Sequence, residues 1–303
     1  MVSCHLGRAH QMTYGPKPVS VADDEQKSLR KYRTVDRKIK GDPFARSKVG
    51  EIVKPGELVD IVELSPLTLN DRRNYNLLIA NAWDRITEAT EHRIRKADLK
   101  GSHESNDRLE DSIKRLMGAI AEIRVIKEGR RAIERVQLLG PNTTHNDDES
   151  GFLYYTFPEP LRNIIQQSEI FARLKTQVMY CFTSKYALCL YEILQKRVNL
   201  EHRQTETFTV TELRSLLNVP EGKLERYADF NRYALKPALK EVNALSDYAV
   251  YLTPKKAGRT VTHLILFWMQ KDLEGRLSAL QELERCSVGR TARIDGKVEK
   301  AVA

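Results

Sequence analysis

The fold is decided by residues 229–243, which read DFNRYALKPALKEVN. On a helix of about 100° per residue, the apolar side chains cover one broad side. The polar side gathers, within about 80°, Arg232, Lys236, Lys240 and Asn243. A cationic stripe opposite a buried face is typical of a helix that enters the major groove of DNA, where arginine pairs with guanine and asparagine with adenine. The stretch therefore predicts a DNA-recognition helix, kinked at Pro237 because proline lacks a backbone donor.

The segments before this helix complete a helix-turn-helix. Ser184 is placed to cap a helix that runs to Val198, and a short strand rich in Thr, Phe and Val follows it. This context disfavours the alternative reading of the stripe as a solvated face that is basic by chance. The expected elements are a helix, a strand, a short helix and a turn at residues 184–198, 207–210, 211–217 and 218–227.

A basic hairpin follows the recognition helix. Residues 248–252 and 260–268 alternate between apolar and polar side chains, which predicts two strands. The hinge between them carries Lys255, Lys256 and Arg259 beside Gly258. These cations cannot build a core, but they can reach a phosphate backbone, as the wing of a winged helix does. The alternative is a hairpin tip whose charge prevents aggregation.

The amino-terminal half repeats this order with little sequence identity. Thr68 and Asp71 form a candidate capping pair before a helix. A later helix carries Arg108, Lys114 and Arg115 as candidate DNA contacts, although acidic residues dilute its polar side. This half is expected to place a helix at 106–123, two strands at 131–139 and 152–157 with a loop at 140–151, and a helix bridging the halves at 161–174.

Composition agrees with an anionic partner. The 303 residues carry 50 Lys and Arg against 41 Asp and Glu, a net charge of +9. Nine of the cations lie between Lys27 and Lys48 against two acids, which predicts a flexible basic arm. In the tail, Leu273, Leu277, Leu280 and Leu283 predict one weak amphipathic helix, and we expect the rest to be disordered. The expected divisions are an arm at 1–50, domains at 51–160 and 161–270, and a charged tail at 271–303.

Several classes are disfavoured. The four cysteines form no C-x-x-C pair, so neither zinc nor disulfides are expected. The chain shows no signal peptide and no apolar run of 18 residues, so we expect a cytoplasmic protein off the membrane. No two histidines lie two apart, as the metal site of a rolling-circle nickase requires. Neither Gly222-Lys223 nor Gly296-Lys297 belongs to a phosphate-binding loop. We expect no enzyme, metal or cofactor.

The sequence resembles the iteron-binding initiators of theta-replicating plasmids. The resemblance covers roughly residues 55–270 and is strongest over 152–268. Its most specific block is FTSKYA at 182–187 with LYE at 190–192, which contains Ser184, Lys185, Tyr186, Tyr191 and Glu192. It continues through ADFNR at 228–232, LKPALKEVN at 235–243, and the wing at 255–259 followed by VTHL.

This resemblance implies an α+β fold of two tandem winged helices joined by a long linker helix. It implies that the carboxy-terminal domain reads each iteron of double-stranded DNA, with Asn231, Arg232 and Lys236 facing the DNA and the wing cations on the backbone. The amino-terminal domain would add backbone contacts and form the dimer interface. Monomers would open the origin and recruit the host initiator and replicative helicase, dimers would repress the initiator's own gene, and the protein would associate with the plasmid or nucleoid.

One departure from the family pattern concerns the recognition helix. This chain has Asn231 and Tyr233 where many relatives carry further basic residues, so we expect it to read a different iteron. The rival interpretation is a winged-helix transcription regulator without an initiator role. Two wings in one chain and the block at 182–192 favour the initiator. A purely structural interaction module is disfavoured by the basic stripe and wing.

Overall fold

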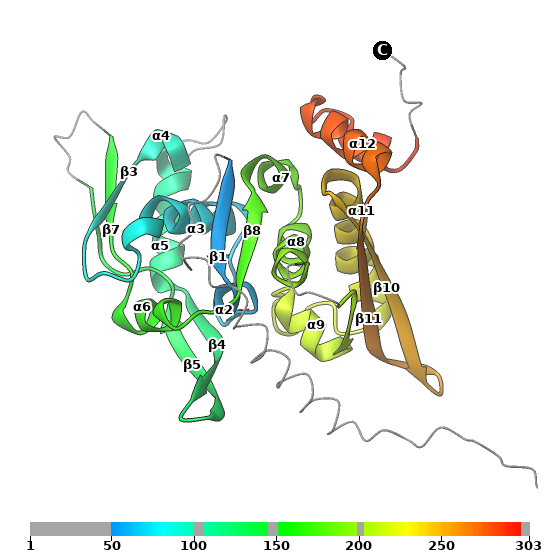
Figure 1. The fold of residues 1–303 in the computed structure, drawn as a ribbon, viewed down its shortest axis with the longest axis horizontal. Coiled ribbons are helices and arrows are strands. Elements are labelled where there is room, and N and C mark those ends of the chain that lie inside the picture. Colours follow the sequence, from blue (N-terminus) through cyan, green and yellow to red (C-terminus); the bar gives the residue numbers. More distant parts are fainter. Residues whose placement is uncertain (1–49, 100–105, 145–150, 199–202, 298–303) are drawn as a thin grey trace, which may run out of the picture. The chain divides into compact units, whose positions relative to one another are not determined.

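The computed structural model describes residues 50–99, 106–144, 151–198 and 203–297, so the predicted basic arm lies outside the described residues. The predicted α+β fold with two winged helices is confirmed (Figure 1). The elements of the first part are β1 (Glu51–Pro55), α2 (Gly56–Val59), β2 (Val62–Glu63), α3 (Leu69–Ala82) with a 3₁₀ turn at Trp83–Arg85, β3 (His92–Arg95), α4 (Lys96–Leu99), α5 (Asn106–Gly118), β4 (Ile120–Lys127), β5 (Arg130–Gln137), β6 (Asn142–Thr143), β7 (Phe152–Tyr155), α6 (Glu159–Gln166) and β8 (Phe171–Lys175).

The capping pair of α3 is confirmed. The Thr68 hydroxyl accepts from the Asp71 amide at 3.2 Å, and the Asp71 carboxylate accepts from the Thr68 amide at 2.8 Å. Each bond satisfies an amide that the helix start leaves without a partner, so helix α3 begins where the sequence predicts.

The hairpin of the first winged helix lies earlier than predicted. Helix α5 ends at Gly118, and residues 120–127 form β4, which pairs with β5. Ile120 and Ile123 fit helical spacing, but their segment is rich in β-branched residues, which favour strands. Glu128 and Gly129 both have positive φ, the conformation of the two-residue turn that matches strand twist. Strand β7 pairs instead with β3 and β6, so the predicted pairing of 131–139 with 152–157 is wrong.

The predicted bridging helix at 161–174 is correct only for its first part, residues 161–166. Helix α6 ends at Gln166, and Phe171–Lys175 forms β8, which pairs antiparallel with β1. The amide of Gly56 donates to the carbonyl of Ile170 at 2.6 Å, at the end of this ladder. The partner strand lies about 120 residues earlier in the chain (Glu51 pairs with Lys175), so no local pattern could reveal it.

The second part follows the predicted order closely. Ser184 caps α8, and β11 pairs with both β9 and β10. The wing strands are longer than predicted and meet at a two-residue turn that begins with Gly258 at φ +60°. The elements are α7 (Thr176–Cys181), α8 (Lys185–Arg197), β9 (Thr205–Thr209), α9 (Val210–Leu216), α10 (Tyr227–Phe230), a π-helical turn (Asn231–Leu235), α11 (Lys236–Leu245), β10 (Tyr248–Ala257) and β11 (Thr260–Gln270).

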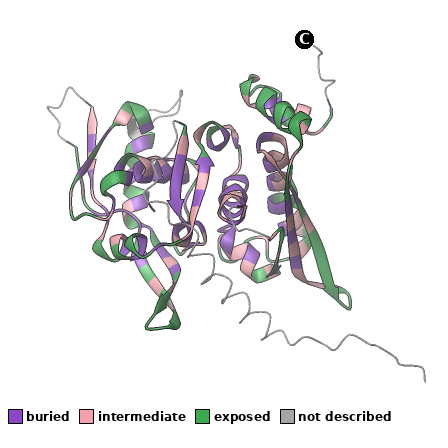
Figure 2. Ribbon diagram, in the orientation of Figure 1, coloured by how far each residue is buried: buried purple, intermediate pink, exposed green. Residues whose placement is uncertain are grey.

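Two hydrophobic cores hold these elements (Figure 2). One packs α3 and α5 against β4, β5 and β7, and includes Tyr75, Leu116 and Tyr155. The other surrounds α8 and includes Phe230 and Trp268 of the second winged helix together with Ile52, Ala172 and other residues of β1, β8 and α7. Most of helix α8 is therefore enclosed, and its half-buried residues lie near its two ends: Lys185, Tyr186, Gln195 and Lys196.

The tail is more ordered than predicted, since residues 273–294 contain α12 (Leu273–Glu284) and α13 (Arg290–Ile294). Glu282 anchors them by accepting from Arg293 at 2.7 Å, and Arg290 donates to the carbonyl of Cys181 at 3.4 Å. Helix α12 does form, but of the four leucines of its predicted apolar face only Leu283 packs, half-buried, against the core around α8. Ala279 and Glu282 are buried, whereas Leu273, Leu277 and Leu280 are exposed.

Candidate nucleic-acid interface

The recognition helix is interrupted by a π-helical turn. Helix α10 passes into a π turn at Asn231–Leu235, and α11 begins with Lys236 and Pro237. Proline has no amide hydrogen, so it fits the first turn of a helix, where that donor would have no partner. The disturbance predicted at Pro237 therefore takes the form of a π turn just before it.

The structure keeps the amino half of the predicted stripe open. Arg232 and Lys236 are exposed, and Asn231 is half-buried. The Arg232 guanidinium carbon lies 5.2 Å from the centre of the exposed Tyr233 ring. In a helix-turn-helix these are the positions that contact base edges, because the recognition helix enters the groove by its amino-terminal residues.

The carboxyl half of the stripe is occupied by internal contacts. The Asn243 amide nitrogen donates to the Val250 carbonyl at 2.8 Å, and the Asn243 oxygen accepts from the Val250 amide at 2.7 Å. This side chain holds the first strand of the wing, which argues against the predicted adenine contact. Lys240 is exposed, but its ammonium group pairs with Asp295 of the α13 carboxyl end at 2.6 Å.

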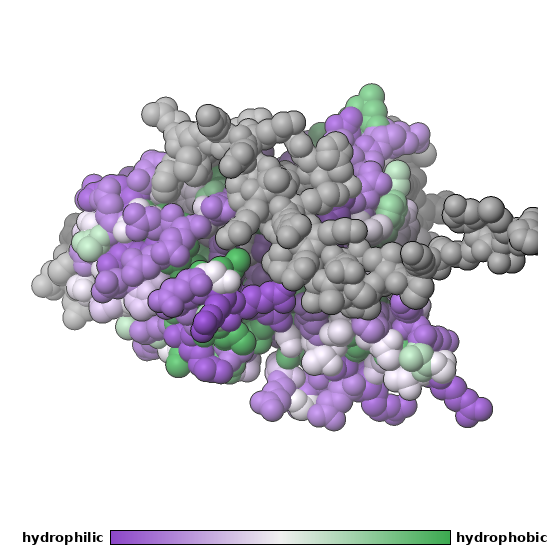
Figure 3. Space-filling model, turned by 60° about the horizontal axis from the view of Figure 1, so that its bottom comes forward, coloured by the Kyte–Doolittle hydropathy of each residue, from purple (hydrophilic) through white to green (hydrophobic). Residues whose placement is uncertain are grey.

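The wing cations lie where the sequence placed them. Lys255, Lys256 and Arg259 are exposed near the tip of the β10–β11 hairpin, and a register shift separates the two lysines. A bulge of this kind turns neighbouring side chains away from strict alternation. Hydrophilic side chains cover most of the described surface in the view of Figure 3.

The three predicted DNA contacts of α5 differ in what they bind within the protein. Arg108 and Lys114 are exposed. Arg115 instead binds the buried Asp71 through two hydrogen bonds of 2.9 Å, which join α5 to the start of α3. These hydrogen bonds raise the pKa of Arg115, and they direct its guanidinium group toward Asp71. This placement argues against Arg115 as a DNA contact.

A second basic hairpin escaped the sequence interpretation. The β4–β5 hairpin exposes five cations around a tight turn: Arg124, Lys127, Arg130, Arg131 and Arg135. Some are internally paired, for example Arg124 with Glu212 of α9 at 3.2 Å. The available signal was the Glu128-Gly129 pair between two runs that contain β-branched residues, because a glycine at this position favours a two-residue hairpin turn.

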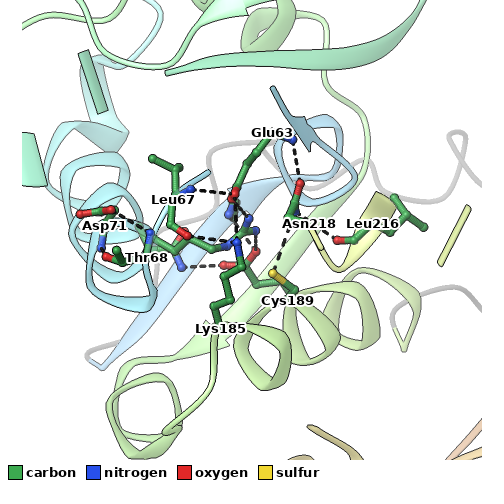
Figure 4. A network of polar contacts seen from close by, with 12 residues as sticks. Glu63, Leu67, Thr68, Asp71, Lys185, Cys189, Leu216 and Asn218 are labelled. Atoms are coloured by element: carbon green, nitrogen blue, oxygen red, sulfur yellow. Dashed lines mark hydrogen bonds and ion pairs between the residues drawn. The ribbon is translucent and has the colours of Figure 1, made fainter. Parts of the chain in front are cut away.

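The block of residues at 184–192 takes part in a network of polar contacts within the fold (Figure 4). Glu192 is fully buried and accepts from Lys54 at 3.0 Å, Arg72 at 2.7 Å and Asn76 at 2.7 Å. Lys54 and Arg72 are only 1% and 3% exposed. Helix α8 is thereby joined to β1 and α3 by charged groups that water does not reach.

The same network extends to Glu63 and the turn after α9. Arg72 also binds Glu63, and Lys185 donates to the Leu67 carbonyl at 3.1 Å. The Asn218 side chain accepts from the Glu63 amide at 2.7 Å. Tyr191 accepts from the Lys175 amide at 3.0 Å, whereas Tyr186 is half-buried. The network thus reaches from the first winged helix to the helix-turn-helix of the second.

Burial and charge act against each other in this network. Burial opposes ionisation of Glu192, but the attraction of Lys54 and Arg72 is stronger and lowers the pKa of this carboxyl. Burial also lowers the pKa of Lys54, and the nearby positive charge of Arg72 acts in the same direction, whereas the Glu192 carboxylate only partly offsets them.

Within the described residues no cluster of His, Cys, Asp and Glu is arranged to hold a metal ion. No described helix is long and apolar enough to span a membrane. Burial raises the pKa of the Cys189 thiol to about 11, which keeps it protonated and unreactive near neutral pH.

Two family models match the sequence. The model described as "Initiator Replication protein, WH1" matches residues 51–195, and the model described as "Initiator Rep protein, WH2" matches residues 209–268. Together they cover most of the chain, including both hairpins and the π turn. Among the curated proteins, no sequence matches this one significantly.

One solved structure with a TM-score above 0.5 shows a similar fold. The structure described as "Crystal structure of Pi initiator protein in complex with iteron DNA" is 19% identical with a TM-score of 0.53, over 75% of this chain and 100% of that chain. The structure of domains 2 and 3 of RctB is 11% identical with a TM-score of 0.43, over 78% of this chain and 96% of that chain.

Proposed function

Because the chain belongs to the family of initiator replication proteins, we propose that it initiates replication of a plasmid by binding repeated DNA sites, the iterons, at the origin. The observation that carries this proposal is the second winged helix. It exposes Arg232 and Lys236 on its recognition helix and three cations at its wing tip. One domain thus offers side chains for base edges and others for phosphates.

The first winged helix is proposed to add backbone contacts. Its β4–β5 hairpin exposes cations at the place where a wing follows the helix-turn-helix, and Lys114 is exposed on α5. Phosphate contacts of this kind fix the position of a protein on DNA without selecting a sequence. Recognition would therefore rest mainly on the second domain, and affinity on both.

The proposal extends to what the family resemblance implies. The bound protein would help to open the origin and recruit the host initiator and replicative helicase, and dimers would repress its own gene. It would work in the cytoplasm on plasmid DNA as a binding protein, without a catalytic step or cofactor. The absence of a spaced histidine pair in the sequence supports a binding role over nicking.

The test is binding to DNA from around the chain's own gene, by gel shift and footprinting at two salt concentrations. Regularly spaced protection over direct repeats is the expected result. Protection of a single palindrome at a promoter would favour the transcription regulator instead. Salt-sensitive binding without any footprint would contradict both functions, because backbone contacts alone produce it.

Lys255→Ala is expected to weaken binding to iteron and unrelated DNA alike, because a phosphate contact carries no sequence information. The slope of log affinity against log salt should fall by about one unit. Titrations at several salt concentrations measure it. Arg85→Ala is the control, since it removes an exposed cation outside the hairpins and α11. A loss confined to iteron DNA would show that Lys255 reads bases.

A further inference from the structure

The open part of the recognition helix is short. Leu239, Lys240, Asn243 and Ala244 line one wall of a pocket of about 500 Å³, and α12 and α13 form the other wall. Asn243 is bonded to the wing and Lys240 to Asp295. The residues of this helix that remain open for contacts with bases are therefore those of the π turn and Lys236, the first residue of α11.

An aromatic ring lies at the centre of this open part. Tyr233 is 54% exposed, although burial of its ring would be favourable. It stands beside Arg232, whose guanidinium group lies over its ring at 5.2 Å. This contact orients a long flexible side chain, which reduces the entropy that Arg232 would lose on binding a base.

The chemistry of the ring selects its partner. The hydroxyl of a tyrosine can donate to a phosphate, whereas its ring packs against apolar groups. In the major groove, the apolar feature of a base edge is the 5-methyl group of thymine, which apolar side chains contact. We propose, given the function proposed above, that Tyr233 is a specificity-determining residue that contacts the methyl group of one thymine in each repeat, beside the base read by Arg232.

Deoxyuridine tests this proposal, because it differs from thymidine only by that methyl group. Each thymine of one protected repeat is replaced in turn. Wild-type protein is expected to lose about fourfold in affinity at one position, the factor for burying one methyl group. Tyr233→Phe should keep this sensitivity, and Tyr233→Ala should bind thymidine and deoxyuridine equally there.

Two results would overturn the proposal. One is a wild-type protein that tolerates deoxyuridine at every position, and the other is a Tyr233→Ala variant with undiminished sensitivity. Both results can be told apart from a failure of the proposed function, because in that case footprinting would show no protected repeat at all. Thermal unfolding of each variant confirms that the exposed ring is not needed for folding.

A second observation concerns Lys240 and carries its own proposal. Its ammonium group lies 2.6 Å from one oxygen of Asp295, while the other oxygen lies 3.3 Å from Lys297. Glu282 holds α13 in place through Arg290 and Arg293. The WH2 family match ends at residue 268, so this acidic contact belongs to an extension of the winged helix.

The geometry points to Asp295 as an internal competitor of DNA phosphate for Lys240, again given the proposed function. A carboxylate and a phosphate oxygen seek the same ammonium hydrogens, so the phosphate must displace Asp295 before it can bind. The C-terminal helices would thereby limit the affinity of the second domain for any DNA, without changing which bases it reads.

A double-mutant cycle with Asp295→Asn and Lys240→Ala tests this competition. Asp295→Asn is expected to raise affinity for iteron and unrelated DNA by up to about fivefold, the range of an exposed ion pair. It should also raise the salt slope by about one unit. Lys240→Ala should change little alone but cancel this gain in the Asp295→Asn background.

The control removes the same charge elsewhere on the extension. Glu274→Gln neutralises an exposed acid of α12 and should change affinity less than Asp295→Asn. Equal gains from both variants would reduce the effect to net charge and overturn the proposal. So would a Lys240→Ala loss that is the same in both backgrounds.

Discussion

Glu192→Ala is expected to lower the free energy of unfolding by about 3–5 kcal/mol, the typical result of removing one partner from a buried ion pair. Lys54 would then remain buried without a carboxylate, and Arg72 would keep only Glu63. Both cations would retain the full cost of having left water. Because Glu192 joins α8 to β1 and α3, the loss should affect both winged helices together.

Chemical denaturation followed by circular dichroism measures this effect. Glu88→Ala is the matched control, because Glu88 forms an exposed pair with Arg85 and should contribute at most about 1 kcal/mol. Glu192→Gln keeps the shape and the Asn76 contact, and should lie between the two. Equal stabilities of Glu192→Ala and Glu88→Ala would contradict a structural role for the network.

The same network predicts an acid dependence. The pKa of Glu192 is lower in the folded protein than in the unfolded chain, where a glutamate titrates near 4.3. Its contribution is therefore fully present above about pH 5 and lost as pH falls through the folded value. The stability of Glu192→Gln should fall less steeply with acid than that of the wild type.

What the sequence could predict depends on how local the cause is. The α3 cap, the wing strands and the exposure of Arg232 and Lys236 follow from residues a few positions apart, and the structure contains all three. The β1–β8 pairing joins strands about 120 residues apart, and the sequence of neither strand indicates its partner. Residues 120–123 were assigned to the preceding helix because Ile120 and Ile123 fit helical spacing, although their β-branched side chains favour a strand.

The candidate site divides in the same way. Exposure of Arg232 and the wing cations follows from helix and strand periodicity. The roles of Asn243, Lys240 and Arg115 are set by Val250, Asp295 and Asp71. The first of these partners lies seven residues away, and the other two lie 55 and 44 residues away. Periodicity identifies a polar face, but it does not reveal which polar side chains on that face form hydrogen bonds or ion pairs within the protein.

Arg232→Ala is expected to weaken binding to the iteron by about 1–3 kcal/mol and to relax the preference at one or two base pairs. Arg232 is exposed in the first turns of the recognition helix, and its planar fork matches the two acceptors of guanine. The π turn and the Tyr233 ring hold it at this position. Its loss removes a base contact, so unrelated DNA should be affected much less.

The measurement compares the affinities of wild type and variant for the repeat and for each single-base substitution of it. Arg276→Ala, which removes an exposed arginine from α12 of the same domain, should leave the preferences unchanged. If Arg232→Ala weakened binding to all sequences equally, Arg232 would be a phosphate contact. Asn231 and Tyr233 would then be the remaining candidates for base contacts on the π turn. If neither affinity nor preference changed, the open half of the stripe would not face DNA.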